Sequence, residues 1–150
     1  MVPAVASKVV QLHWNMDGLV TVTPEDEDRF SIKVSRVIEI LQQAKRPDDF
    51  KQQFNLLLRI LAGWLAGQPG VGEAFVTLRD GALAFVVVRN SCKYDEQFED
   101  ALSELDFDCA NDPDLNLIRM DAIALPPASA SALSSFLDPE FKIEYCGHVD

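Results

Sequence analysis

The stretch PDDFKQQFNLLLRILAGWLA, residues 47–66, does most to decide the fold. Pro47 suits the first turn of a helix, and Gly67 suits its end. The apolar side chains recur at helical spacing and form one wide stripe: Phe50, Phe54, Leu57, Leu58, Leu61, Trp64 and Leu65, widened by Leu56 and Ile60. We therefore predict a helix at the centre of the fold or in a dimer interface, with Phe54, Leu58, Leu61 and Leu65 almost wholly buried.

Two short strands and another helix are predicted before this stretch. Runs rich in β-formers at 8–14 and 19–23 flank a loop, residues 15–18, that ends in Asp-Gly and suits a hairpin turn. Thr23, Pro24 and four successive acids then start a helix that should reach about Lys45. One of its faces is apolar.

After residue 66 the chain returns to strands. Runs at 75–79 and 82–89 are joined by Asp80-Gly81, the strongest hairpin signal in the chain. A helix at 94–105, a strand at 115–125, an Ala/Ser-rich helix ending near Leu137 and a strand at 141–146 follow. The order β-β-α-α-β-β-α-β-α-β predicts an α+β fold with a mixed, mostly antiparallel sheet and helices packed on at least one face.

The composition predicts one globular domain, residues 1–150, in the cytoplasm. An apolar content of 48% supplies a core that needs no disulfide. The three cysteines are odd in number and form no CxxC pair, which fits a reducing compartment. No signal peptide is expected at the N-terminus. The most apolar run, 54–66, is interrupted by Arg59 and is shorter than the ~20 residues of a membrane-spanning helix.

The net charge of -11 limits the partners that this chain can have. A strongly negative molecule repels nucleic acids and anionic lipid surfaces, so neither is expected to bind. A basic protein, a cation or a neutral small molecule stays compatible with the charge. The same charge also keeps a rather apolar chain soluble.

Cys92 is the best-placed candidate for a catalytic nucleophile. It lies in RNSCK, residues 89–93, between a predicted strand and a predicted helix, where amide dipoles and Lys93 can lower a thiol pKa. No second cysteine is near in the sequence, and Phe98 stands where a phosphatase-type pattern requires arginine. An incidental thiol at a helix start explains the same residues.

Other patterns lack part of what their chemistry needs. The glycines of 67–72 precede a strand and no Gly-Lys-Ser/Thr, so they end a helix and form no phosphate loop. The acidic stretch 106–114 has the wrong spacing for an EF-hand. Cys146 and His148 would need two further ligands to bind zinc, and a frayed terminus is the alternative. We therefore predict no metal and no cofactor, and we expect His13 to be a half-buried strand residue.

The segment 94–118 contains nine acids and no lysine or arginine. In a helix its first acids would share or border the outer face, and they are our candidates for partner binding: Asp95, Glu96, Glu99 and Asp100. Like charges at this spacing repel each other, so cations elsewhere in the fold or in a partner should compensate them. A merely solvated face is the alternative. Arg29, Lys33 and Arg36 form a basic strip on the first helix that could meet the acids of a second copy.

Two functions are compatible with these features. The first is a small acidic protein-binding or accessory module, adaptor-like or chaperone-like, that forms a homodimer. It is favoured because no catalytic constellation is visible and the charge is polarised. The second is a small-molecule enzyme or ligand-binding domain that uses Cys92, His13 and acidic residues. A pocket in which Cys92 or His13 meets a carboxylate would favour the second.

Overall fold

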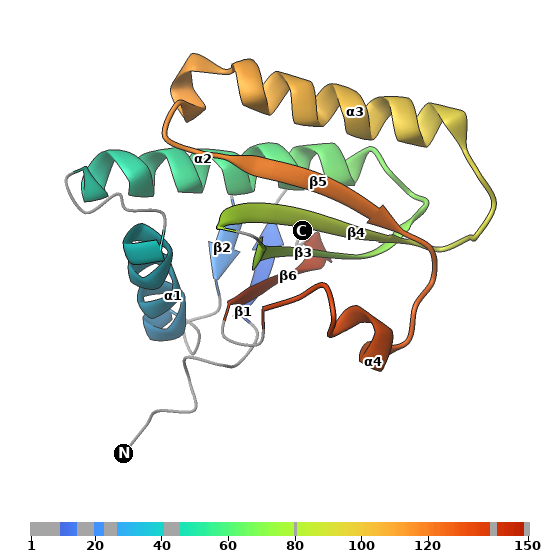
Figure 1. Ribbon diagram of the computed structural model, residues 1–150, viewed down its shortest axis with the longest axis horizontal. Coiled ribbons are helices and arrows are strands. Elements are labelled where there is room, and N and C mark those ends of the chain that lie inside the picture. Colours follow the sequence, from blue (N-terminus) through green and yellow to red (C-terminus); the bar gives the residue numbers. More distant parts are fainter. Residues whose placement is uncertain are drawn as a thin grey trace.

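A computed structural model describes residues 10–14, 20–22, 27–40, 46–79, 81–138 and 141–148 (Figure 1). The elements follow in the order β1 (Val10–Trp14), β2 (Val20–Val22), α1 (Glu27–Ile40), α2 (Pro47–Ala66), β3 (Val71–Arg79), β4 (Ala82–Arg89), α3 (Glu96–Asn111), the 3-10 turn η3 (Pro113–Leu115), β5 (Met120–Leu125), α4 (Ala130–Leu133) and β6 (Lys142–His148). The predicted α+β class is confirmed, and the order of helices and strands is the predicted one with η3 added.

The strands form one six-stranded sheet in the order β2-β1-β6-β3-β4-β5. The pairs β1–β2, β3–β4 and β3–β6 are antiparallel, while β1–β6 and β4–β5 are parallel. The sheet is therefore mixed and mostly antiparallel, as predicted. The last strand lies between the first and the third, and β5 forms one edge.

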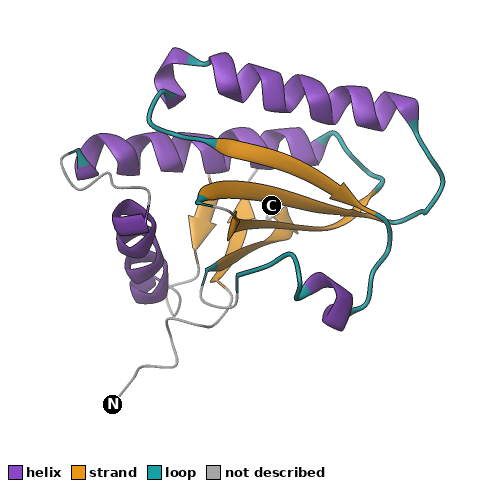
Figure 2. Cartoon of the chain, in the orientation of Figure 1, coloured by secondary structure: helices purple, strands orange, loops and turns teal. Residues whose placement is uncertain are grey.

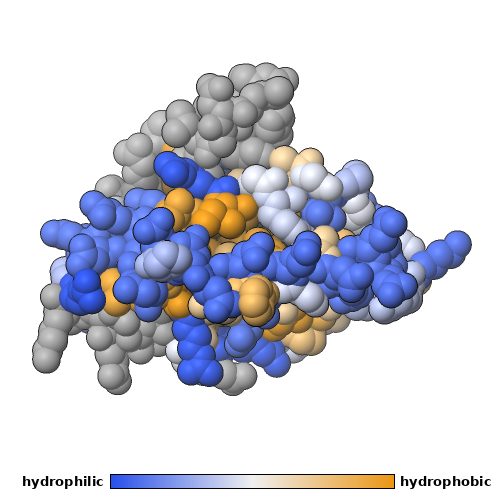
Figure 3. All heavy atoms as spheres, turned by 90° about the horizontal axis from the view of Figure 1, so that it is seen from above, coloured by the Kyte–Doolittle hydropathy of each residue, from blue (hydrophilic) through white to orange (hydrophobic). Residues whose placement is uncertain are grey.

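Each face of the sheet has its own covering layer (Figures 1 and 2). Because side chains alternate along a strand, Val76 and Phe85 pack in one cluster with α1, α2 and α3, whereas Phe75 and Val86 pack in another with Leu133 of α4. The helical layer holds the larger core. Viewed from the side of α3, the outer surface is largely hydrophilic (Figure 3).

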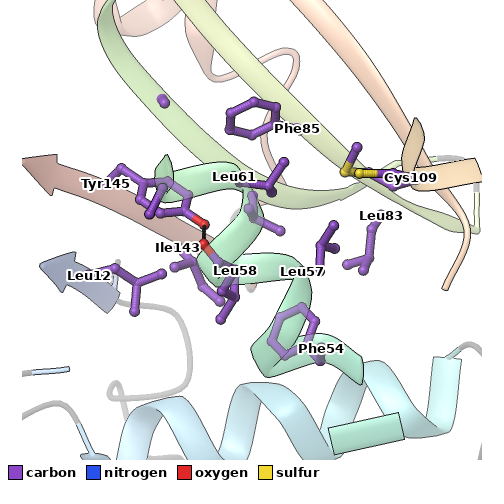
Figure 4. Close-up of a cluster of buried hydrophobic side chains, with 14 of the residues drawn as sticks. Leu12, Phe54, Leu57, Leu58, Leu61, Leu83, Phe85, Cys109, Ile143 and Tyr145 are labelled. Carbon is purple, nitrogen blue, oxygen red and sulfur yellow. Dashed lines mark hydrogen bonds between the residues drawn. The ribbon is translucent and has the colours of Figure 1, made fainter. Parts of the chain in front are cut away.

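The apolar stripe of α2 lies beside buried side chains of β1, β4 and β6 (Figure 4). Its buried members are Phe50, Phe54, Leu57, Leu58, Leu61 and Ala62. Burial of Phe54, Leu58 and Leu61 is confirmed, but Leu65 is only partly buried, so that prediction was wrong. The stripe is rotated toward Ala62, because the helix is covered by α1 on one side and by α3 on the other. A single chain thus encloses most of this stripe.

Three hydrogen bonds, two of them buried, join segments that are far apart in the sequence. The Tyr145 hydroxyl of β6 donates to the Leu58 carbonyl of α2 at 2.7 Å (Figure 4). Thr77 of β3 donates its hydroxyl to the Phe141 carbonyl at 2.7 Å and accepts from the Asp138 amide at 2.8 Å. These bonds fix β6 and the segment that precedes it against the rest of the fold.

Several predicted boundaries were wrong. α3 continues past Leu105 to Asn111, because Cys109 extends the buried series Phe98, Leu102 and Leu105 by one more turn. The acidic stretch 106–114 is therefore helix as far as Asn111. β5 begins at Met120 after η3, and the Ala/Ser-rich segment forms only the short α4. The predicted loop 15–18 and the end of the first helix, 41–45, lie outside the described residues.

Candidate functional site

The outer side of α3 carries the acids that we predicted for partner binding. Glu96 and Asp100 are exposed, and Glu99 is half-buried. Asp95 is the N-cap: its side chain accepts a hydrogen bond from the Phe98 amide at 3.2 Å. Asp95 is exposed but has a structural role in starting the helix, so the acids without such a role begin at Glu96.

The acidic surface continues along the whole helix. Glu96, Asp100, Glu104 and Asp108 follow at intervals of four residues, and all four are exposed. Residues four apart lie one above the other on a helix, so these carboxylates form one row. We call them the acidic row. Hydrophilic side chains run along this side of the molecule in Figure 3.

Two large aromatic side chains are exposed near the ends of α3. Tyr94, just before the helix, is 78% exposed, and Phe107 in its last part is 69% exposed. An exposed aromatic residue among charged ones is typical of surfaces that bind other proteins. Sequence reasoning missed Phe107, because the predicted helix ended before it. Cys109 continues the i, i+3, i+4 series of buried residues, so the sequence could have indicated that the helix extends past Phe107.

A cavity of about 330 Å³ lies between the last part of α3 and the start of β5. Its lining combines charged and apolar residues: Asp106, Cys109, Ala110, Ile118, Arg119, Met120 and Asp121. Burial and the nearby charge of Asp121 raise the pKa of Asp106, while the Ala122 backbone amide acts in the opposite direction. Burial, followed by the acids Asp112, Asp106 and Asp108, raises the pKa of the Cys109 thiol to about 11. The Cys109 thiol is therefore protonated at neutral pH and is no nucleophile.

Cys92 lies in the exposed loop between β4 and α3. The amide dipoles of α3 act within its first turn. Because Asp95 is the N-cap, Cys92 lies outside this turn. The loop is held by other contacts. The Arg89 guanidinium lies 5.1 Å from the Phe98 ring and donates to the Lys93 carbonyl, and the Lys93 amide donates to Ser91 Oγ at 3.1 Å.

His13 and Cys92 do not come together. His13 is half-buried in β1, as expected, opposite Thr21 of β2. β6 and β3 lie between β1 and β4, and at ~4.8 Å per strand they separate His13 from the end of β4 by roughly 14 Å. Three cavities lined by described residues, at α1 and α2, at α2 and η3, and at α3 and β5, include neither His13 nor Cys92 in their lining. The backbone of His148 pairs with Trp14, so the expectation of a frayed end was wrong.

The predicted basic strip on α1 is not a continuous surface. Lys33 is only 1% exposed, because it shares the inner side of α1 with Val34 and Val37. Arg36 is exposed and Arg29 is half-buried. The expectation that these three cations could meet the acids of a second copy was therefore wrong for Lys33.

Within the ranges that the structure describes, no group of three or more His, Cys, Asp or Glu side chains is arranged to hold a metal ion. Cys92 and Cys109 carry free thiols, while the Cys146 side chain lies outside the described residues. The absence of a bound metal stays a prediction.

Of the helices described, none combines the length and the apolar character needed to cross a bilayer. Comparisons with models of protein families, with curated proteins and with solved structures found no match.

Proposed function

We propose that this chain is a protein-binding or accessory module, adaptor-like or chaperone-like, that recognises a basic segment of its partner through α3. The acidic row is the observation that supports this function: Glu96, Asp100, Glu104 and Asp108 are exposed and stand four residues apart. Each like-charged pair at this spacing destabilises a helix by ~0.2–0.5 kcal/mol. A partner that supplies cations removes this repulsion and gains the attraction in its place.

The surroundings of the acidic row suit the same partner. No lysine or arginine occurs between Tyr94 and Ile118, so the row has no cation within its own segment. Phe107, 69% exposed, offers apolar contact area beside the charges. Charge complementarity speeds encounter and selects the partner, while an aromatic side chain contributes affinity once it is covered.

Neutral variants test this function. Glu96→Gln, Asp100→Asn and Glu104→Gln together remove three charges from the acidic row and leave the Asp95 cap intact. The matched control, Glu39→Gln, Glu73→Gln and Asp114→Asn, removes three exposed charges from α1, β3 and η3. Each form is purified from native cytoplasm, and the proteins that accompany it are quantified by mass spectrometry.

We expect a basic partner that stays with the control and is lost from the α3 variant. Recovery of the same proteins with all three forms would contradict a role for α3 in binding.

We also infer a cytoplasmic protein, a homodimer and no nucleic-acid partner. The free thiols of Cys92 and Cys109 support a cytoplasmic location. The net charge of -11 supports the absence of a nucleic-acid partner. The homodimer was inferred from the wide apolar stripe of α2, which one chain largely encloses, so a pair would have to form through other surfaces. Sedimentation equilibrium at micromolar concentration tests it: a mass near twice 16.7 kDa supports a dimer, and a single-chain mass removes it.

A further inference from the structure

Helix α1 lies beside the first half of α2 and runs in a different direction (Figure 1). Where the two helices meet, they leave a cavity of about 150 Å³. Its polar lining comes from Ser31 and Ser35 of α1 and from Lys51 and Asn55 of α2. Residues four apart lie one above the other on a helix, so each helix contributes polar side chains from two successive turns.

The rest of the lining is apolar. Phe30 and Val34, also four residues apart on α1, complete it. The Phe30 ring stacks on Phe54 of α2 with centroids 6.2 Å apart, and Val34 is only 5% exposed. The core therefore holds both side chains in place, and they give the cavity a fixed apolar wall.

The four polar side chains of the lining are available to a ligand. Within the described part of the chain, no hydrogen bond or ion pair engages any of them. No aspartate or glutamate lines the cavity, and Asp48, which precedes Lys51 by three residues in α2, is not part of the lining. Lys51 thus supplies a positive charge that no acid of the lining neutralises.

The larger cavity between α2 and η3, about 430 Å³, differs in this respect. There the Gln53 amide donates to Asn116 Oδ1 at 2.7 Å, and Arg46 Nε lies 3.3 Å from Asp49 Oδ2. Four of its polar side chains are thus already paired with one another. Of these two cavities, the smaller one is therefore the better candidate for a ligand.

The donors of the smaller cavity match an oxyanion. The Lys51 ammonium offers three donors, the Asn55 amide two and each serine hydroxyl one. Hydrogen bonds from a charged donor to an anionic oxygen are the strong ones. A phosphate monoester presents three terminal oxygens where a carboxylate presents two, so it uses more of these donors.

The size of the cavity limits what accompanies the phosphate. A protein cavity of ~150 Å³ holds one benzene molecule. The space therefore suits a phosphate group with a short organic stem. The net charge of -11 repels an anion at long range, but at physiological ionic strength exposed charges more than ~8 Å apart are largely screened. Contacts inside the cavity then decide binding.

We propose that the cavity between α1 and α2 binds a small soluble phosphate monoester. The Lys51 ammonium and the serine hydroxyls hold the phosphate, and the organic stem lies against Phe30 and Val34. A phosphorylated membrane lipid is disfavoured, because the net charge of -11 repels an anionic surface as a whole. This site lies on α1 and α2, so it goes beyond the proposed function of α3, and either can fail without the other.

Phenyl phosphate is the probe, because its ring tests the apolar wall. It is titrated into the full-length 15N-labelled chain, and NMR follows the amide shifts. Inorganic phosphate and benzoate are titrated in the same way. We expect saturable shifts confined to residues near 30–35 and 51–55, with phenyl phosphate binding at least tenfold more tightly than benzoate and severalfold more tightly than inorganic phosphate.

Three results of these titrations would overturn the proposal. Shifts that spread over lysines and arginines elsewhere would show unspecific attraction of an anion. Equal affinity for benzoate and phenyl phosphate would remove the choice of phosphate. Equal affinity for inorganic phosphate and phenyl phosphate would remove the contact of the stem with the apolar wall.

Variants of Lys51 locate the charged contact. Lys51→Met keeps the apolar part of the side chain and should weaken phenyl phosphate binding at least tenfold. Arg59→Met removes an exposed cation from the same helix and should leave the affinity unchanged. Equal losses in the two variants would show an unspecific effect of charge and overturn the site. Circular dichroism verifies that each variant is folded.

The serine hydroxyls are tested by Ser31→Ala with Ser35→Ala. Alanine suits a helix, so the fold should be unchanged while binding of phenyl phosphate weakens about fivefold. Ser103→Ala, an exposed serine of α3, is the control and should have no effect. Unchanged affinity of the double variant would contradict a phosphate held by these hydroxyls.

Vesicles separate a soluble ligand from a lipid. Phosphatidylcholine vesicles that contain phosphatidic acid present a phosphate monoester on a membrane surface. We expect the protein to stay in the supernatant when they are sedimented. Sedimentation with the vesicles that is lost in Lys51→Met would assign the cavity to a lipid head group and overturn the soluble ligand.

Discussion

Helices α2 and α3 lie on the same face of the sheet but use their surfaces differently. α2 has a neighbour on both sides: Phe30 of α1 stacks on Phe54 at 6.2 Å, and Phe98 of α3 meets Trp64 at 5.9 Å. α3 lies at the edge beside β5 and keeps its outer side free (Figure 1). Both helices are amphipathic. The central or edge position of a helix in this layer therefore decides whether its surface is open to a partner.

Leu58→Ala tests the central helix and should have the largest effect. Leu58 is buried, so truncation removes apolar contacts and leaves a cavity, with an expected loss of ~2–5 kcal/mol in the free energy of unfolding. Urea denaturation measures it. Arg59→Ala, an exposed change in the same helix, is the control and should stay within ~0.5 kcal/mol. A loss below half a kcal/mol for Leu58→Ala would show that α2 is oriented differently.

Leu102→Ala is the matched change in the edge helix. Leu102 is buried against the same core, but α3 has one flank in solvent and can relax toward the sheet. We expect a loss of ~2 kcal/mol, at the lower end of the range for such changes. Urea denaturation under the same conditions gives the difference between the two helices. A loss as large as that of Leu58→Ala would contradict the distinction between centre and edge.

Tyr145→Phe examines how α2 is held to β6. The change removes the hydroxyl that donates to the Leu58 carbonyl and keeps the ring in the core. A hydrogen bond of this kind contributes ~0.5–1.5 kcal/mol, and we expect a loss in that range. Thermal and urea unfolding measure it, with Tyr94→Phe, an exposed tyrosine, as the control. No difference between the two variants would mean that the bond adds nothing to stability.

Asp106→Asn should give the smallest effect, and with the opposite sign. The pKa of Asp106 is raised in the folded state above 3.8, first by burial and then by Asp121, so its charged form disfavours folding. This cost is fully present above the raised pKa and disappears as the pH falls through it toward 3.8. The variant should therefore be more stable than the wild type at pH 7.

The gain in stability of Asp106→Asn should shrink as the pH is lowered below the raised pKa. Unfolding temperatures of wild type and variant across this range measure it, with Asp114→Asn, an exposed acid of η3, as the control for the change in net charge. A gain that grows on acidification would have the wrong sign and would contradict a raised pKa.

Sequence periodicity predicted α2 well and α3 less well. The apolar stripe from Phe50 to Leu61 repeats over several turns, so the sequence predicted most of the inner side of α2. The exceptions are Ala62, which is buried, and Leu65, which is only partly buried. In α3 the buried series ends on Cys109, and the acids around it suggested a loop. The exposed acids Glu96 and Asp100 were predicted, whereas Phe107 and the cavity at Asp106 were missed.

The sequence by itself determined the local elements. Alternation and helical spacing need only near neighbours, and so does the turn at Gly81, whose φ of 77° suits glycine. Those signals were enough for the class of fold and the order of its elements.

Only the tertiary structure decided which distant residues meet. β6 lies between β1 and β3, Tyr145 reaches Leu58 across 87 residues, and the Ala122 backbone amide of β5 bonds the Asp106 carboxyl of α3. Lys33 is buried although its sequence neighbours suggest a surface helix. The physical reason is that strand pairing and burial depend on how several elements pack together, which no short window of sequence contains.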